Sequence, residues 1–277
     1  MIGVPMKTYE AITVISNHII DDGLCDAIIL KGSIGRGDDD EFSDVDMYLI
    51  VSPEHMDTVL QRRCAYLSAY KEIVYLEDVN FGLPQKVAIY VDALHVDLYV
   101  ARMEQIGHAD PIRVWYDPKG LFSDYIYHRI DIADGEIAPY FSEVLYCFAE
   151  ADSAYRRKNY AWAARILGNA IAEAAILLRY LYDKKYAFLG LKKINEIIPH
   201  DQYQLLETAY THLGENGFQK SNECLIRVLE IFVSNAGDSL RNKLNMRLFD
   251  WIKGSLGCLL FPKMSEDACH KCVRKGK

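Results

Sequence analysis

No stretch of the sequence predicts an export signal or a membrane anchor. The first residues, MIGVPMKTYE, lack the basic start followed by an apolar core that a signal peptide has. The longest apolar run, AIAEAAILLRYLY, is interrupted by Glu173 and Arg179 and is too short to span a bilayer. These two absences argue against a membrane protein, and we expect no membrane partner.

Cysteines in a disulfide pattern are also missing. The seven cysteines are odd in number and mostly scattered, which favours reduced thiols and a cytoplasmic protein. Cys269 and Cys272, in CHKC, have the spacing of half a zinc site, but no second Cys-x-x-C or His pair completes it. We interpret them as part of a C-terminal tail that binds no metal, and their role stays open.

The first 150 residues have no basic stripe of the kind that binds nucleic acid. The net charge is −8, and residues 241–277 hold nine Lys or Arg against three Asp or Glu, so the remainder carries about −14. An acidic body attracts nucleic acid poorly and suits a cationic small molecule. We therefore expect no nucleic-acid partner. The basic tail is interpreted as solvated, with an interaction surface as the alternative.

Glycine and proline become less frequent after residue 137, and the apolar pattern changes there. Short apolar runs bounded by turns come first, mixed with amphipathic helices, and long helical patterns follow. The predicted fold is α+β, with a mixed β-sheet and helices in residues 1–130 and an all-helical bundle in residues 131–277. The predicted strands cover 27–33, 45–52, 86–101 (a hairpin) and 112–120, and the predicted helices cover 8–22, 53–70, 137–157, 160–183, 190–197, 201–215 and 220–236.

Two carboxylates stand one residue apart at the entrance to an apolar strand, in FSDVDMYLIV. Because residues two apart in a strand point to the same side, Asp44 and Asp46 face one way, and Val45 and Met47 face the other. Like charges held this close repel unless a cation compensates, and Mg²⁺ is the simplest one. Asp97, in HVDLYV, adds a third carboxylate if the two strands are neighbours. Such a cluster suits a two-metal site for phosphoryl displacement.

A Gly-Ser turn ends the strand that precedes these acids. The backbone N–H groups of such a turn and the Ser33 hydroxyl suit the outer phosphates of a nucleotide, next to Gly32. Arg36, one helical turn later, can add a charge-assisted contact, and Ser43 can bond a phosphate or orient Asp44. Each feature alone is common in structural turns and strands. Their combination in this order is specific.

In GSIGRGDDDEFSDVDMYLIVS and HVDLYVA, the sequence resembles the nucleotidyltransferase superfamily that shares its catalytic fold with DNA polymerase β. Within it, the resemblance is to the aminoglycoside and kanamycin nucleotidyltransferases, with weaker support from WYDPKGLF. By motif order the resemblance covers roughly residues 8–125. It covers the helical half in architecture alone, since these enzymes also carry a C-terminal helical bundle.

The resemblance implies a Mg²⁺-dependent transfer of a nucleoside monophosphate, with AMP from ATP favoured, to a hydroxyl of a small molecule, with pyrophosphate released. An aminoglycoside or lincosamide antibiotic is the favoured acceptor, and antibiotic resistance the expected outcome. Two magnesium ions are expected, the helical domain would contribute to the acceptor pocket, and a homodimer stays open. The resemblance assigns the nucleotide to Gly32, Ser33, Arg36 and Ser43, and metal binding with catalysis to Asp44, Asp46 and Asp97.

The resemblance also implies a glutamate base on the first helix of the helical domain. The matching stretch, VLYCFAEADSAYRRKN, places Glu150 there. A lysine expected one turn later is replaced by Ala154, which is a departure from the family. The residues considered as substitutes for that lysine are Arg156, Arg157 and Lys158, and the alternative bases are Glu143, Glu173 and Asp97.

Two other functions stay open. One is a nucleotidyltransferase that modifies a protein or RNA, as in toxin–antitoxin systems, and the missing basic stripe counts against RNA. The other is a member that binds nucleotide without turnover. The intact Gly-Ser turn and carboxylates count against it.

Overall fold

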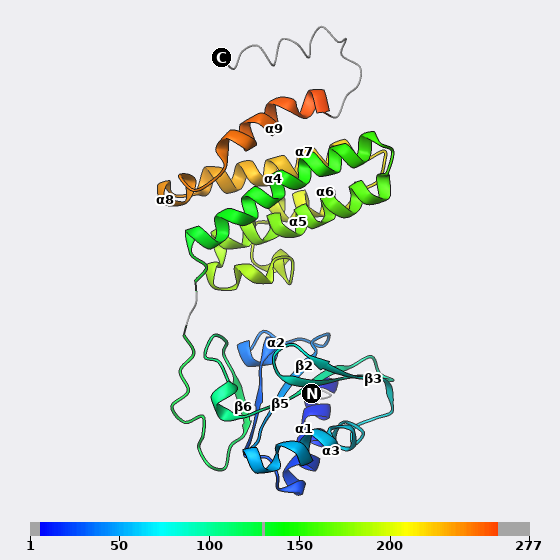
Figure 1. Ribbon diagram of the computed structural model, residues 1–277, viewed down its shortest axis with the longest axis vertical. Coiled ribbons are helices and arrows are strands. Elements are labelled where there is room, and N and C mark those ends of the chain that lie inside the picture. Colours follow the sequence, from blue (N-terminus) through cyan, green and yellow to red (C-terminus); the bar gives the residue numbers. More distant parts are fainter. Residues whose placement is uncertain (1–5, 129–130, 260–277) are drawn as a thin grey trace, which may run out of the picture. The chain divides into compact units, whose positions relative to one another are not determined.

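The computed structural model describes residues 6–128 and 131–259 (Figure 1). The chain divides into two compact units, residues 1–129 and residues 130–277, where the sequence predicted a division between 130 and 131. All strands among the described residues belong to the first unit, and the second unit is helical. The chain therefore has the α+β class that the sequence predicts.

The first unit is built on a six-stranded mixed sheet with the order β3-β4-β5-β2-β1-β6 (Figure 1). β2 and β5 are parallel, and the other neighbouring strands are antiparallel. The elements are α1 (Lys7–Asp22), β1 (Ala27–Leu30), α2 (Gly32–Arg36), β2 (Val45–Ile50), η1 (Pro53–His55), α3 (Met56–Leu67), β3 (Ile73–Asn80), β4 (Pro84–Tyr90), β5 (His95–Ala101), η2 (Met103–Gln105) and β6 (Arg113–Tyr116).

The two faces of the central strands differ in polarity, because successive strand residues point to opposite faces. Val45 and Met47 of β2 are fully buried in a cluster with residues of α1 and α3, and β5 contributes Leu98 to the same cluster. Asp46 and Tyr48 alternate with these residues and are only partly buried. One face therefore packs against α1 and α3. The other carries the polar side chains of β2 and β5, and further along these strands Ile50 and Ala101 belong to a second, smaller apolar cluster.

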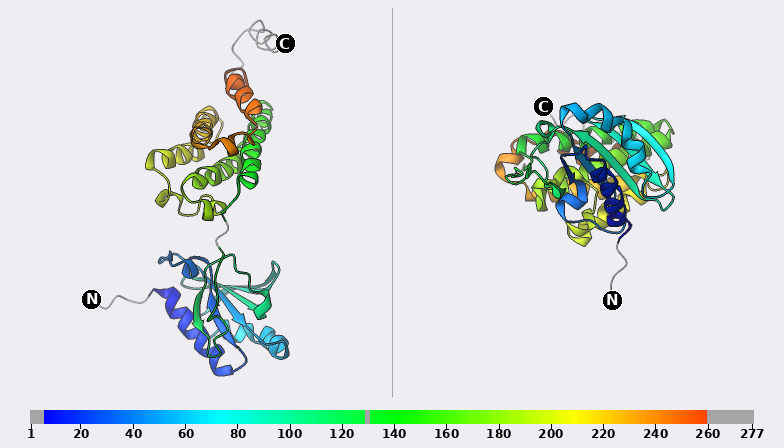
Figure 2. Two further views of the ribbon diagram at one scale, coloured as in Figure 1. Left: turned by 90° about the vertical axis from the view of Figure 1, so that its left-hand side faces the viewer. Right: turned by 90° about the horizontal axis from the view of Figure 1, so that it is seen from below.

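The second unit is a helical bundle around one hydrophobic core, in which α4 packs along α5 and α6 along α7 (Figures 1 and 2). α5 is long and apolar enough to cross a membrane by length and composition, but half of its most apolar stretch is buried, as in a core helix. The elements are α4 (Asp134–Arg156), α5 (Tyr160–Tyr182), η3 (Lys184–Leu189), η4 (Ile194–Glu196), α6 (His200–Thr211), α7 (Phe218–Asn235), α8 (Asp238–Arg241) and α9 (Met246–Leu259).

α9 corrects the interpretation of a basic, solvated tail from residue 241. Phe249 and Ile252, three residues apart on one helix face, are buried in the core of the bundle. The basic residues of this segment, Arg247 and Lys253, are exposed, and Lys253 pairs with Glu230 at 2.5 Å. The basic composition of this segment did not reveal that it forms an amphipathic helix. The CHKC motif at 269–272 lies outside the described residues.

Two other predictions differ from the structure. Residues 190–197 were expected to be helical, but only η4 forms there. β3 was not predicted, and it pairs antiparallel with β4 at one edge of the sheet. Most residues of β3 are exposed, so its sequence lacks the alternation of a half-buried strand.

Candidate active site

Asp46 and Asp97 lie side by side on the polar face of the sheet. They are register partners in the parallel pair β2 and β5, so their side chains leave neighbouring strands on the same face. Both are partly buried, and the Asp97 side chain is 14% exposed. Two carboxylates this close are stabilised by a shared cation or a shared proton. The structure thus brings together two of the three predicted carboxylates.

Asp44 comes directly before β2 and is partly exposed. It precedes Asp46 by two residues, which in an extended chain places it toward the same face. Within residues 6–128 and 131–259, no group of three or more His, Cys, Asp or Glu side chains has the arrangement of a preformed metal site. The three-carboxylate metal site therefore stays a prediction, with the Asp46–Asp97 pair as its observed part.

The Gly-Ser turn lies against this pair. Gly32 has a φ of 59°, in the left-handed region that favours glycine, and a Cβ at this position would overlap the Asp46 carboxylate. The N–H of Lys31 donates to the backbone oxygen of Asp46 at 3.0 Å, which ties the turn to β2. Ser33 is 2% exposed, and its hydroxyl has no hydrogen-bond partner among the described residues. A buried, unpaired hydroxyl next to the glycine invites a polar ligand.

Arg36 and Ser43 both have partners within their own loop. Arg36 forms an ion pair with Asp38 at 3.1 Å. The Ser43 hydroxyl accepts from the N–H of Asp40 at 2.9 Å and lies 3.2 Å from the Asp40 carboxylate, to which it can donate. These bonds shape the loop that leads into Asp44. The nucleotide roles of Arg36 and Ser43 stay predictions.

His95 shares the face of Asp97 and contacts it. The distance between His95 Nε2 and Asp97 Oδ1 is 3.0 Å, and the His95 side chain is 42% exposed. This hydrogen bond restricts the rotamer of the Asp97 carboxylate. His95 is therefore a positioning group for Asp97.

Two tyrosines form the next row of the same face. Tyr48 and Tyr99 are register partners, and their rings stack with centroids 4.2 Å apart and an interplanar angle of 11°. Burial, and then the charge of Asp46, raises the pKa of Tyr48 to about 12, although the hydrogen bond with Tyr99 acts against this. Burial also raises the pKa of Tyr99. Both rings are neutral near pH 7 and form a floor beside the carboxylates.

Lys31 supplies positive charge on this floor. Its Nζ lies 5.0 Å from the centroid of the Tyr48 ring. Burial lowers the pKa of Lys31, and the charges of Asp110 and Asp46 partly offset this effect. Lys31 and the tyrosine pair are not among the site residues predicted from the sequence. The available signal was a Lys directly before Gly-Ser, and Asp-x-Tyr repeated in two strands, as DMY and DLY.

The predicted base, Glu150, and two of its alternatives, Glu143 and Glu173, lie in the second unit, whereas the third alternative, Asp97, belongs to β5 of the first unit. Glu150 is exposed on α4 and accepts a hydrogen bond from the Tyr146 hydroxyl at 3.1 Å. Burial, and then the charge of Glu143, raises the pKa of Glu173 on α5, and its Oε2 is buried without a partner among the described residues. Burial and all three glutamates raise the pKa of Cys147 to about 11. The three candidate bases thus gather around one thiol.

The residues considered as lysine substitutes lie where α4 ends. Arg156 donates to the Asp152 carboxylate at 2.7 Å. Lys158 has a φ of 60°, in the turn that joins α4 to α5. The roles of Arg156, Arg157 and Lys158 as substitutes for the lysine stay predictions.

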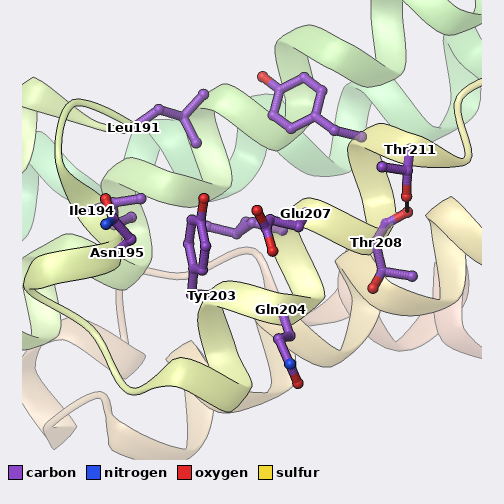
Figure 3. Close-up of a pocket in the computed structure, with 10 residues that line it drawn as sticks. Leu191, Ile194, Asn195, Tyr203, Gln204, Glu207, Thr208 and Thr211 are labelled. Carbon is purple, nitrogen blue, oxygen red and sulfur yellow. Dashed lines mark hydrogen bonds between the residues drawn. The ribbon is translucent and has the colours of Figure 1, made fainter.

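A pocket of about 840 Å³ lies in the second unit and contains none of the predicted site residues (Figure 3). Leu191, Ile194 and Asn195 border it from the segment before α6, and α6 contributes Tyr203 and Glu207 (Figure 3). A smaller pocket of about 260 Å³ in the first unit is lined by Asp26, Ile50 and other residues, again without the carboxylate pair. Pocket size alone therefore does not locate the candidate site, which is identified by its charged groups.

No protein-family model matches the chain, and no curated protein matches it. An aminoglycoside 6-adenyltransferase from Bacillus subtilis is similar in structure, with 9% identity, coverage of 93% of this chain and 99% of that chain, and a TM-score of 0.40. A nucleotidyltransferase-like protein from Exiguobacterium sibiricum is 14% identical, and the match covers 93% of this chain and 79% of that chain with a TM-score of 0.32. A CCA-adding enzyme in complex with CTP is 11% identical, and the match covers 95% of this chain and 75% of that chain with a TM-score of 0.33. At these values the similarities assign no activity.

Proposed function

We propose that this chain is a nucleotidyltransferase. It would transfer a nucleoside monophosphate, with AMP from ATP favoured, to a hydroxyl group of a small molecule and release pyrophosphate. The observation that carries this function is the in-register pair Asp46 and Asp97, with the backbone of Gly32 against the Asp46 carboxylate. Paired carboxylates hold a hard divalent cation, and a glycine backbone lets phosphate oxygens approach closely.

The donor atoms of the site fit magnesium. Asp44, Asp46 and Asp97 offer only carboxylate oxygens, and Mg²⁺ takes oxygen ligands from one or two carboxylates together with substrate phosphates. Zinc sites favour nitrogen and sulfur ligands instead. When bound, magnesium would polarise the phosphoryl group and offset the negative charge of the leaving pyrophosphate.

The residues of the chain would bind and orient the nucleotide. The backbone N–H groups of the Gly32–Ser33 turn and the Ser33 hydroxyl would donate to phosphate oxygens, and this contact supplies the partner that the buried hydroxyl lacks. The contact between His95 and Asp97 would keep that carboxylate in one rotamer. The tyrosine pair beneath excludes water from one side.

The transfer itself exchanges one phosphorus–oxygen bond for another. The acceptor oxygen bonds to the α-phosphorus, the bond from this phosphorus to the pyrophosphate oxygen breaks, and the acceptor proton passes to a carboxylate base. We propose Glu150 as this base, with Glu143, Glu173 and Asp97 as the alternatives. Catalysis would rest on positioning and charge, without a covalent enzyme intermediate.

We propose a cationic acceptor, of the aminoglycoside or lincosamide class. The chain carries a net charge of −8. Three carboxylates on α4 and α5 also lie near enough to Cys147 to raise its pKa by their charge, those of Glu143, Glu150 and Glu173. Such negative charge attracts an amine-bearing ligand over distances of about 10 Å at an ionic strength of about 0.1 M.

Pyrophosphate release from Mg-ATP with a panel of aminoglycosides and lincosamides tests this function. Wild type should release pyrophosphate with at least one acceptor, and Asp46→Asn should not. Asp57→Asn, an exposed change on α3, is the matched control and should keep the wild-type rate. Release that is equal in wild type and Asp46→Asn would contradict the proposed function.

The same protein separates the alternatives. Labelled AMP that appears on proteins or RNA of a cell lysate, without any small-molecule product, would indicate the macromolecular acceptor. ATP that raises the melting temperature in the presence of magnesium, without pyrophosphate release under any condition, would indicate binding without turnover.

A further inference from the structure

Lys31 has an environment that an ordinary structural lysine lacks. It directly precedes the Gly-Ser turn, its N–H donates to Asp46, and its side chain is partly buried. Among the described residues, its ammonium has no ion-pair or hydrogen-bond partner, and it lies over the Tyr48 ring instead. A partly buried ammonium has three N–H donors to satisfy. It thus remains available to an anion.

The charges around Lys31 hold it on the polar face. Asp46 and Asp110 both attract the ammonium, one from β2 and one from the loop before β6. Tyr48 lies below it and is itself fixed by the stacked ring of Tyr99. A cation over an aromatic face is attracted without using its N–H donors in hydrogen bonds, so these contacts orient Lys31 and leave its donors available.

We propose that Lys31 binds a phosphate oxygen of the nucleotide, and that Tyr48 and Asp110 position it for this contact. This role rests on the proposed function. A triphosphate brought to the carboxylate pair adds negative charge to an acidic face, so a fixed cation on that face is needed beside any metal. Lys31 lies in register with Asp46, and the Ser33 hydroxyl two residues later supplies a second donor on the same turn.

Isothermal titration of the full chain tests this role with three probes, ATP, inorganic tripolyphosphate and adenosine, each with magnesium. Lys31→Met keeps the length of the side chain and removes its charge. It should lower the affinity for ATP and for tripolyphosphate by about 10-fold or more, the usual effect of a lost charge-assisted hydrogen bond. Lys31→Arg should restore most of the affinity. Adenosine, which has no phosphate, should bind equally to wild type and to both variants.

Lys119→Met is the matched control. Lys119 also faces a carboxylate, Asp26 at 2.5 Å, but at the beginning of β1, and its loss should leave all three affinities unchanged. Asp110→Asn in the Lys31→Met background distinguishes phosphate binding from simple neutralisation of Asp110. Restoration of ATP affinity by this second change would overturn the proposed contact.

The outcomes separate this role from the function on which it rests. If wild type releases pyrophosphate and Lys31→Met binds ATP as tightly as wild type, the phosphate contact is wrong and the transferase function stands. If Lys31→Met weakens adenosine as much as ATP, Lys31 is structural and the proposed contact is also wrong. If wild type neither binds ATP nor releases pyrophosphate, both fail together.

Discussion

Asp46 and Asp97 face each other across the parallel pair β2 and β5, with their side chains on the side away from α1 and α3. The pair is far apart in sequence, and the β3–β4 hairpin and α3 lie between its two strands along the chain. The fold therefore creates a local excess of negative charge that the flanking apolar residues cannot relieve. A divalent cation would relieve it, and this is the chemistry that we propose for the site.

Asp46→Asn and Asp97→Asn should each lower the rate of pyrophosphate release by about 100-fold or more, because each removes a ligand charge at the transferred group. In the absence of magnesium, neither change should lower the melting temperature, because each removes the repulsion between the Asp46 and Asp97 carboxylates. The assay is release from Mg-ATP, with thermal melting of the same samples in EDTA.

Magnesium should raise the melting temperature of wild type and should raise it less in both variants. A magnesium-dependent rise of the same size in all three proteins would show that the ion binds elsewhere. Asp57→Asn again serves as the control, since this exposed residue lies on α3 and not on the polar face.

Gly32→Ala should abolish transfer and lower the melting temperature by a few degrees. Gly32 has a positive φ, and the added Cβ would overlap the Asp46 carboxylate and force it to move. Gly37→Ala separates the two effects, because Gly37 also has a positive φ of 80° but a Cβ there meets nothing within 4 Å.

In both glycine variants the left-handed backbone should lower the free energy of unfolding by about 1–2 kcal/mol, which the midpoint of urea unfolding measures. Only Gly32→Ala should also lose pyrophosphate release. Equal activity in the two variants would mean that the approach of Gly32 to Asp46 has no part in the reaction.

The sequence predicts the strands that carry the site because their pattern is local. Period-two alternation gives the faces of β2, and the Gly-Ser turn and the acids follow in a fixed order. The pairing of Asp46 with Asp97 requires that their two strands be neighbours in the sheet. The sequence does not determine whether they are. The hairpin predicted over 86–101 is present as the antiparallel pair β4 and β5.

Other features were out of reach for physical reasons. β3 is exposed along most of its length and is held by its backbone hydrogen bonds to β4. Its sequence therefore has no alternation of apolar residues from which a strand could be predicted. α9 is amphipathic, but its charges gave the segment the composition of a tail. Lys31 has no significance until the register places it opposite Asp46 and above Tyr48. Such roles arise from tertiary contacts and not from local spacing.

Tyr48→Phe should make the protein more resistant to alkali. Burial and Asp46 raise the pKa of Tyr48 from 10.0 to about 12, so the neutral phenol is favoured in the folded state. The stability that this shift provides is fully present below pH 10 and is lost as the pH rises from 10 to about 12. Phenylalanine cannot ionise and removes this loss.

The check is the urea midpoint of wild type and Tyr48→Phe at pH 8 and at pH 11. The fall in midpoint between the two pH values should be smaller for the variant. Tyr182→Phe, at an exposed position on α5, should show the same fall as wild type. An identical fall for all three proteins would mean that Tyr48 ionises as easily as an exposed tyrosine.

Glu173→Gln should stabilise the protein near neutral pH and should show whether this residue is the base. Burial, and then Glu143, raises the pKa of Glu173 above its usual 4.5, so the folded state favours the protonated carboxyl. The associated stability is present below pH 4.5 and is lost as the pH rises through the folded-state value. The neutral amide avoids this loss, so the variant should melt on the order of 2 °C higher than wild type at pH 7, and the gain should vanish near pH 4.

The same change tests the roles of the three glutamates. If Glu150 is the base, Glu150→Gln should lower the rate of transfer by about 100-fold or more with ATP affinity unchanged, since general-base catalysis contributes roughly this factor. Glu173→Gln and Glu143→Gln should then retain transfer. Loss of transfer in Glu173→Gln, with full activity in Glu150→Gln, would move the base to α5, where its raised pKa and buried Oε2 already set Glu173 apart from the exposed Glu150.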